Sequence, residues 1–411
     1  MITVIDSPCG AGKTTWAINY MNDVNTRLNN KFIFVTPFLD EVARIKSELK
    51  EKGCEPSYTS TSKTKRESFK ELIQQAKPVI VTTHATFLGM TNDIIELIKE
   101  QNYTLILDET LDVITITDLH TFDVVSFTAN KIAELDANTG RIIHTDYSNN
   151  NDEAPNIRKS YYRDQKDVIE SDRLYHRDYG NGGMVFNVFP PEVFMAFNDV
   201  YILTYMFDCQ IMYCYFNMFS IKYEIKSVVG GELTEYTRLA LDKDFITICH
   251  NEKGNRLGKD DTQLSKTWYK SATKKQFNKL KEAMKYALTR KYGKPKSAKE
   301  IMWTCFQDYK QYLYVKDIPK GRFIACNIKA TNKYADSVYV AYLINRYMNP
   351  MLKQFIESFG TIVNDDCWAA SELVQFICRS AIRDGKHIIL YLPSERMRVI
   401  LRDYLKTYSL S

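Results

Sequence analysis

A short segment near the start of the chain carries residue types that bind phosphate. Residues 7–15 read Ser-Pro-Cys-Gly-Ala-Gly-Lys-Thr-Thr, between an apolar run and a helical pattern of apolar residues. Gly10 and Gly12 allow backbone N–H groups to approach phosphate oxygens, and a helix that begins after them directs its positive end to the same place. Lys13 is expected to neutralise the β- and γ-phosphates, and the Thr14 hydroxyl to ligate Mg²⁺. This pattern predicts a Walker A loop for ATP and Mg²⁺, made of Pro8, Cys9, Gly10, Ala11, Gly12, Lys13, Thr14 and Thr15.

A pair of acidic residues is expected to complete the site. The apolar run at 103–107 predicts a central parallel strand, and Asp108 and Glu109 follow at its carboxyl end. Ligands of open α/β sheets bind at that edge. Asp108 would hold Mg²⁺, directly or through water, and Glu109 would polarise the attacking water. The alternative is that both acids cap a helix beginning near Thr110.

A glutamine and two arginines near the other end of the chain are spaced four residues apart. Residues 371–383 predict a helix on which Gln375, Arg379 and Arg383 recur at i, i+4 and i+8 and so form one polar face. An ATPase that closes between two lobes needs guanidinium groups at the γ-phosphate, where charge develops during transfer. We therefore assign these three residues to catalysis. The alternative is a surface helix that makes salt bridges, although few acids lie nearby.

Strand and helix signals alternate along the chain, as in α/β proteins with parallel sheets. In the first half, apolar runs at 32–35 and 79–81 give way to Thr36-Pro37 and to Thr83-His84, side chains suited to a sugar-phosphate backbone. Separately, each is more often a strand end or a helix N-cap. In the second half the strand candidates are residues 245–248, 301–304, 323–326 and 388–392.

Two segments depart from this alternation. The polar stretch 136–183 is interpreted as an insertion in a first domain spanning residues 1–207. Residues 251–300, in a second domain spanning 208–411, hold fifteen Lys/Arg and five Asp/Glu and predict a basic helical segment that could contact phosphate. Within it, Trp268 could stack on bases, although buried packing is the alternative.

The overall composition narrows the class of protein. The chain is 45% hydrophobic and 26% charged, as expected of a protein with buried cores, and no apolar run is long enough to cross a membrane. The N-terminus shows no targeting peptide. The nine cysteines form no CxxC pair, which predicts reduced thiols in a cytoplasm rather than a disulfide framework or a zinc site.

Taken in order, these motifs resemble the superfamily 2 (DExD/H-type) helicase core, and especially compact helicase-like ATPases of phages and mobile elements. Residues 7–15 resemble motif I and 105–109 motif II. The remaining similarities are 34–37 to motif Ia, 81–84 to Ib, 203–205 to III, 303–305 to IV, 325–332 to V and 375–383 to VI. The resemblance implies two tandem RecA-like P-loop domains. It also implies that Asn327, Thr331 and Asn332 of motif V contact nucleic acid.

The hypothesis that follows is an ATP-dependent translocase or helicase. Its expected substrate is single-stranded or forked DNA, in replication or recombination of a phage or mobile element, with replication proteins as possible partners. The alternatives are a packaging-type P-loop ATPase, a small-molecule kinase, and a nucleotide-binding loader or regulator that does not unwind.

Overall fold

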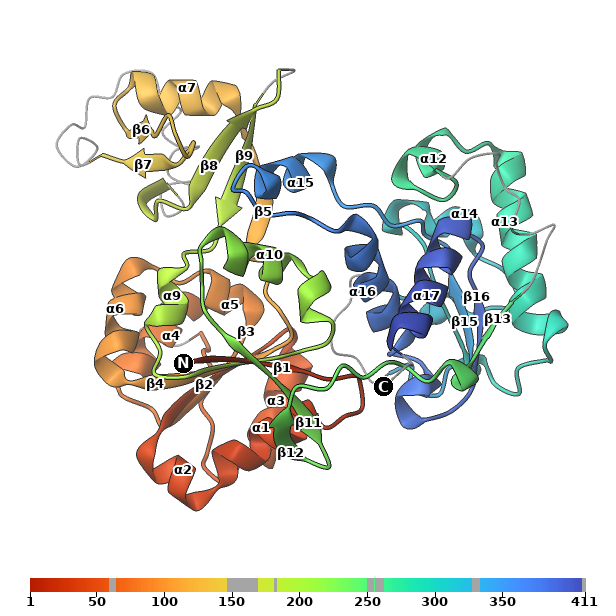
Figure 1. Cartoon of the computed structure of the whole chain (residues 1–411), viewed down its shortest axis with the longest axis horizontal. Helices are drawn as coiled ribbons and strands as arrows, with labels where there is room; N and C mark the ends of the chain where they lie inside the picture. Colours follow the sequence, from red (N-terminus) through yellow and green to blue (C-terminus); the bar gives the residue numbers. More distant parts are fainter. Residues whose placement is uncertain are drawn as a thin grey trace.

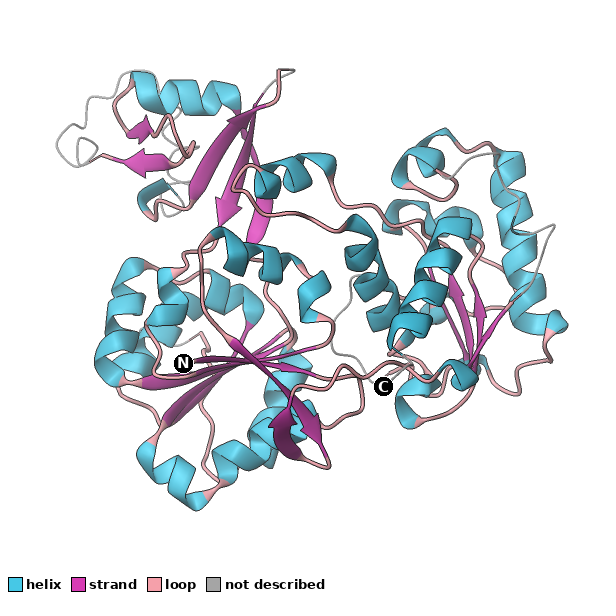
Figure 2. Cartoon of the chain, viewed as in Figure 1, coloured by secondary structure: helices cyan, strands magenta, loops and turns pink. Residues whose placement is uncertain are grey.

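The computed structural model describes residues 1–58, 64–145, 169–180, 183–249, 255, 262–326 and 333–408. Two sheets lie side by side in the molecule, each between layers of helices (Figure 1; Figure 2). A smaller module contacts both halves of the chain. Asn327, Thr331 and Asn332, expected to contact nucleic acid, lie outside the described residues.

The first sheet has seven strands in the order β12-β11-β1-β10-β4-β2-β3. All of its strand pairs are parallel except the hairpin of β11 and β12. The strands predicted from the apolar runs are confirmed. The bounds are β1 Ile2–Asp6, β2 Lys31–Thr36, β3 Val79–Thr83, β4 Tyr103–Asp108, β10 Val200–Thr204, β11 Glu224–Val229 and β12 Glu232–Glu235.

Helices cover both faces of this sheet, because alternate strand residues point to opposite sides. Ile5 and Phe34 pack with α1 and α3 on one face, whereas Val4 and Val35 belong to the core on the other face, with α4, α5, α6, α9 and α10. The helix bounds are α1 Lys13–Asn22, α2 Val24–Asn29, α3 Leu39–Glu48, α4 Lys65–Gln74, α5 His84–Leu88, α6 Asn92–Gln101, α9 Glu192–Met195 and α10 Ile211–Met218.

The expected boundary between residues 207 and 208 does not coincide with the end of the first sheet. Strands β11 and β12 follow it in sequence, yet β11 pairs with β1. The chain therefore leaves the first sheet only after Glu235.

The insertion also begins earlier than its polar composition indicated. Strands β5, β9 and β8 form an antiparallel sheet of their own, and β6 and β7 form a hairpin. Leu119, Phe127 and Val185 belong to a separate small core. The module thus starts at Ile114. The sequence predicts a later start because the first strand and helix of the module are half apolar and do not belong to the polar stretch. Its elements are β5 Ile114–His120, α7 Thr121–Ala129, β6 Ala133–Leu135, β7 Ile142–His144, β8 Leu174–Asp178 and β9 Gly183–Val188.

This module touches the second half of the chain through α15 (Pro350–Glu357), as Figure 1 shows. The rings of Phe186 and Phe355 stack with centroids 4.2 Å apart, and the Tyr179 hydroxyl donates a hydrogen bond of 3.1 Å to the Met351 carbonyl. Phe355 is fully buried. The insertion in the first half is therefore packed onto the second half.

The second sheet has four parallel strands in the order β13-β16-β15-β14. Trp303 and Tyr339 pack on one face with α12 and α13, whereas Met302 and Val340 pack on the other with α16 and α17. The elements are β13 Ile246–Ile248, α12 Lys266–Ser271, α13 Lys274–Tyr286, β14 Ile301–Thr304, α14 Lys310–Leu313, β15 Tyr339–Tyr342, α16 Asp365–Ile377, β16 Ile388–Tyr391 and α17 Glu395–Tyr408.

The strand predicted at 323–326 is wrong. Phe323 makes only an isolated bridge to Trp303, and the third strand of the sheet is β15 instead. The preceding Arg322 is buried and donates hydrogen bonds to the carbonyls of Ile301 and Lys299, so the segment is tied to the start of β14 rather than paired along it.

The described part of the basic segment forms helices as predicted, and Phe277, Leu280 and Met284 lie on the buried side of α13. Trp268 does not present a face for stacking on bases. It is only 8% exposed and its ring lies edge-on to Tyr269, with centroids 5.1 Å apart. The packing alternative for Trp268 is therefore correct.

Candidate nucleotide site between the two halves

The Walker A loop joins β1 to α1 and has a backbone that glycine alone adopts easily. Gly10 and Gly12 have φ of +80° and +87°. A Cβ on Gly10 would lie 2.6 Å from the Arg383 carbonyl oxygen, so a larger residue would push the loop away from the second half. The two ends of the chain therefore meet at this loop.

Lys13 stands at the start of α1 and its ammonium is held by the loop. Its Nζ donates to the carbonyl of Ser7 and, at 3.0 Å, to that of Pro8. Burial lowers the pKa of Lys13, while the charges of Glu109 and Asp108 act in the opposite direction. An anionic ligand here would gain strongly from this cation, because little water screens it.

Asp108 ends β4 and Glu109 follows it, and both line the cavity with the loop, as the sequence predicted. Thr14 Oγ1 donates to Asp108 Oδ1 at 3.2 Å. Burial, and next the charge of Glu109, raise the pKa of Asp108 to about 7. A hydroxyl and a carboxylate this close are the hard oxygen donors that Mg²⁺ prefers, so the two residues fit the expected metal.

The arginine segment reaches the same place, but not as one helix. Helix α16 ends at Ile377, and Ser380 starts a 3₁₀ turn by accepting a hydrogen bond from the Ile382 N–H. The predicted helix 371–383 is therefore correct over residues 371–377 and wrong beyond them, because the serine hydroxyl competes for backbone groups that a continuing helix would use. Gln375 lies on α16, whereas Arg379 and Arg383 follow it.

Residues from both halves line one cavity of about 290 Å³. Arg379 is 7% exposed, and burial lowers the pKa of its guanidinium, opposed first by the charge of Glu109 across the cleft. The lining includes most of the predicted nucleotide site. Its residues are Cys9, Gly10, Gly12, Lys13, Thr14, Thr15, Glu41, Arg44, Asp108, Glu109, Tyr205, Gln375, Cys378, Arg379 and Arg383.

Several of these cavity residues did not stand out in the sequence. Glu41 and Arg44 lie on α3, and Arg44 donates to Glu41 at 2.8 Å. Their spacing of three on a helix after the second strand was the available signal. Gln210 also went unnoticed: it accepts from the Thr110 hydroxyl and donates to Thr204 Oγ1 at 2.9 Å, so it links the segment after Glu109 to the end of β10.

The residues expected to contact nucleic acid lie in varied settings. Thr36 is fully buried, which contradicts a direct contact with a strand. Thr83 caps α5, and the Nε2 of His84 lies 3.0 Å from the Asp108 carbonyl oxygen. His84 thus lies beside the acidic pair. Pro37, directly after β2, is half-buried.

The cysteines are not all reduced thiols, contrary to the prediction. Disulfides join Cys9 to Cys378 and Cys209 to Cys367. Each links residues more than 150 positions apart in the sequence, with separations of 369 and 158, and such proximity leaves no trace in local spacing.

Comparison with known proteins shows the family to which the chain belongs. Residues 2–114 match the family described as "Type III restriction enzyme, res subunit", and residues 241–405 match "YonV C-terminal Rossmann-like domain". The "SPbeta prophage-derived uncharacterized protein YonV" of Bacillus subtilis (strain 168) is 36% identical over 427 residues, covering 98% of each chain. The chain belongs to the YonV family. A solved structure named "XPD_APO" aligns with this YonV-family protein at a TM-score of 0.47 and 11% identity, over 98% of this chain and 95% of that one.

The protein has a superfamily 2 helicase-like core, with two sheets of mainly parallel strands and flanking helices. The resemblance drawn from the motifs is thereby confirmed, and the family match over residues 2–114 supports a helicase-type ATPase. Among the described residues, none of the helices combines the length and apolar character that crossing a bilayer requires.

Proposed function

We propose that this YonV-family protein is an ATP- and Mg²⁺-dependent translocase or helicase. Its proposed substrate is single-stranded or forked DNA, used in replication or recombination of a phage or mobile element in the cytoplasm. The observation that supports the proposal best is the shared cavity, in which the Walker A loop of the first half faces Arg379 and Arg383 of the second. A site divided between halves couples nucleotide turnover to their movement.

The proposed roles follow from position and charge. Lys13 neutralises the phosphates, and Thr14 and Asp108 hold Mg²⁺, which supplies positive charge to the transferring phosphoryl group when bound. Glu109 orients the attacking water. Arg379 and Arg383 stabilise the negative charge that develops at the γ-phosphate, with Gln375 beside them.

Nucleic acid is proposed to cross the edge where the strands of both sheets end. Pro37 follows β2 and Thr83 ends β3, two neighbouring strands of the first sheet. Asn327, Thr331 and Asn332 of motif V are proposed to contribute from the second half. The relative in Bacillus subtilis is named as derived from a prophage, which supports a role in a mobile element.

The test is ATP hydrolysis titrated with single-stranded, duplex and forked DNA and with RNA. We expect single-stranded or forked DNA to raise turnover, and Lys13→Ala to abolish it. Lys99→Ala is the matched control, since Lys99 is exposed on α6 and pairs with the exposed Glu96. Turnover indifferent to every nucleic acid would rule out a motor. Stimulated turnover without strand displacement would exclude a helicase and leave a translocase or a loader.

A further inference from the structure

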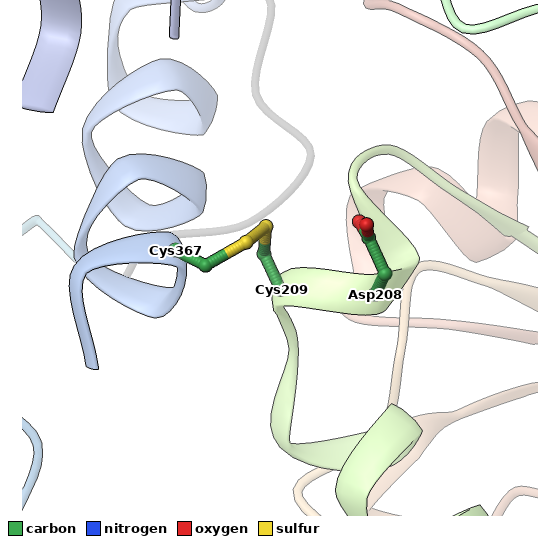
Figure 3. A group of neighbouring side chains, drawn as sticks. All are labelled: Asp208, Cys209 and Cys367. Carbon is green, nitrogen blue, oxygen red and sulfur yellow. A yellow bond between two sulfur atoms is a disulfide. The ribbon is translucent and has the colours of Figure 1, made fainter. Parts of the chain in front are cut away.

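Two cysteine pairs connect the halves of the molecule. Cys9 and Cys378 have Cα atoms 5.9 Å apart, and Cys209 and Cys367 have Cα atoms 4.9 Å apart. Both separations fall in the range that a disulfide spans without backbone movement. Figure 3 shows the second bond, from the short 3₁₀ helix Phe207–Cys209 of the first half to α16 of the second.

Both bonds end on the same helix. Cys367 lies in the first turn of α16, and Cys378 is its C-cap residue. Their partners follow the strands β10 and β1, which are neighbours in the first sheet. Helix α16 is therefore attached to the first half at both ends, and separation of the halves there would require both bonds to break.

One of the bonds lies at the nucleotide site itself. Cys9 belongs to the Walker A loop and Cys378 precedes Arg379, and both line the cavity. A covalent bond at this point holds the arginine segment against the loop. A cycle of closure on ATP and opening on ADP moves these two segments apart, so the bond and the cycle are incompatible.

We propose that the two pairs are dithiol–disulfide modification sites that lock the halves together when oxidised and release them when reduced. This rests on the proposed function, because the lock acts on the ATP cycle. In each pair two thiols lose two protons and two electrons and form one S–S bond. A low-molecular-weight disulfide such as oxidised glutathione accepts the two protons and the two electrons and becomes two thiols. A dithiol reductant reverses the step.

The surroundings of the cysteines favour exchange at these pairs. Cys9 and Cys367 are partly exposed, whereas their partners Cys378 and Cys209 are buried, so each bond offers one sulfur to an incoming thiol. The other cysteines of the described residues are unpaired. Among them, burial raises the pKa of Cys214 to about 11, which disfavours its reactive thiolate.

A metal ion is the competing occupant of the second pair. One oxygen of Asp208 and the sulfurs of Cys209 and Cys367 lie within 4.8 Å of one another. Asp208 is, however, ion-paired with Arg238, and a bond already joins the two sulfurs. In the part of the chain that the structure describes, no such three-ligand group surrounds Cys9 and Cys378. A disulfide accounts for both pairs by one chemistry.

The experiment compares the full chain equilibrated with oxidised glutathione and with dithiothreitol. Peptide mapping by mass spectrometry without reduction should find Cys9 linked to Cys378 and Cys209 linked to Cys367. Oxidised protein should hydrolyse ATP at least about tenfold more slowly than reduced protein, since a bond that prevents opening blocks product release. Dithiothreitol should restore the rate.

The variants Cys367→Ser and Cys378→Ser each remove one bond, and the double variant removes both. We expect the ratio of reduced to oxidised turnover to fall to about one in the double variant. It should stay unchanged in Cys54→Ser, which alters an unpaired, half-buried cysteine. Small-angle scattering of nucleotide-free protein supplies a readout without ATP: reduced protein should be more expanded than oxidised protein.

Three results would overturn the proposed disulfide lock. The first is that neither linked peptide is found after oxidation. The second is that the linked peptides are found but oxidised and reduced protein have equal scattering and equal turnover, and the third is that the protein holds stoichiometric zinc, which Cys367→Ser loses. If reduced protein hydrolyses no ATP under any condition, the proposed function fails. The linked peptides and the scattering difference then still test whether the disulfides hold the two halves together.

Discussion

The charge of Asp108 gives the sharpest prediction about the site. Burial and the neighbouring Glu109 raise its pKa to about 7, so the carboxyl group is largely protonated below that pH. A protonated carboxyl group does not ligate Mg²⁺, and the proton and the metal therefore compete for the Asp108 carboxylate, which also accepts from Thr14. Lowering the pH should weaken Mg²⁺ binding, and raising it should strengthen binding until the group is fully ionised.

The size of the effect follows from the titration. With a pKa near 7, about 90% of Asp108 is ionised at pH 8 and about 9% at pH 6, so the apparent affinity for Mg²⁺ should fall roughly tenfold from pH 8 to pH 6. The assay is the Mg²⁺ concentration that half-saturates binding of a fluorescent ATP analogue at pH 6, 7 and 8.

The nucleotide phosphate also titrates in this range, so a baseline is needed. Asp108→Asn removes the carboxylate and should leave only the pH dependence of the nucleotide. Asp112→Asn alters a nearby exposed acid and should behave as the unchanged protein does. Equal pH dependence in the unchanged protein and in Asp108→Asn would refute the assignment of Asp108 to the metal.

Two further predictions concern contacts between the halves. Arg379→Ala should lower kcat by at least about a hundredfold with little change in nucleotide affinity, because a guanidinium at the γ-phosphate acts mainly on the transition state; Arg402→Ala, at an exposed position of α17, should not. An equal loss of affinity and kcat would contradict that role. Phe355→Ala should destabilise the protein by about 3–5 kcal/mol, since it empties a fully buried site stacked on Phe186. Thermal melting should show this loss and no comparable loss in Val399→Ala, where the side chain is 47% exposed; equal melting of both variants would show that the module is not held by α15.

The sequence predicted correctly those parts of the fold that depend on a few consecutive residues. The Walker A loop, the acidic pair and the buried strands each depend on a run of a few residues, with apolar positions leading directly to the polar ones. Asp108 is predicted at the carboxyl edge of the sheet because the apolar residues 105–107 before it must be buried, and all three are. Local pattern and tertiary position agree at these places.

One error was local: the helix before Arg379 ends because Ser380 caps a new turn. The other errors arose where distant contacts decide the structure. The segment after Arg322 is held by the buried guanidinium of Arg322 rather than by strand pairing. The pairing of Cys9 with Cys378 depends on the two halves meeting. Spacing along the chain cannot report such contacts.

A structure determined with ADP, Mg²⁺ and aluminium fluoride tests the central claim most directly. We predict that the fluoride, which occupies the place of the transferring phosphoryl group, lies within about 3 Å of Lys13 Nζ and of a guanidinium nitrogen of Arg379 or Arg383. A fluoride bound by Lys13 alone, with both arginines turned away, would contradict a site shared between the two halves.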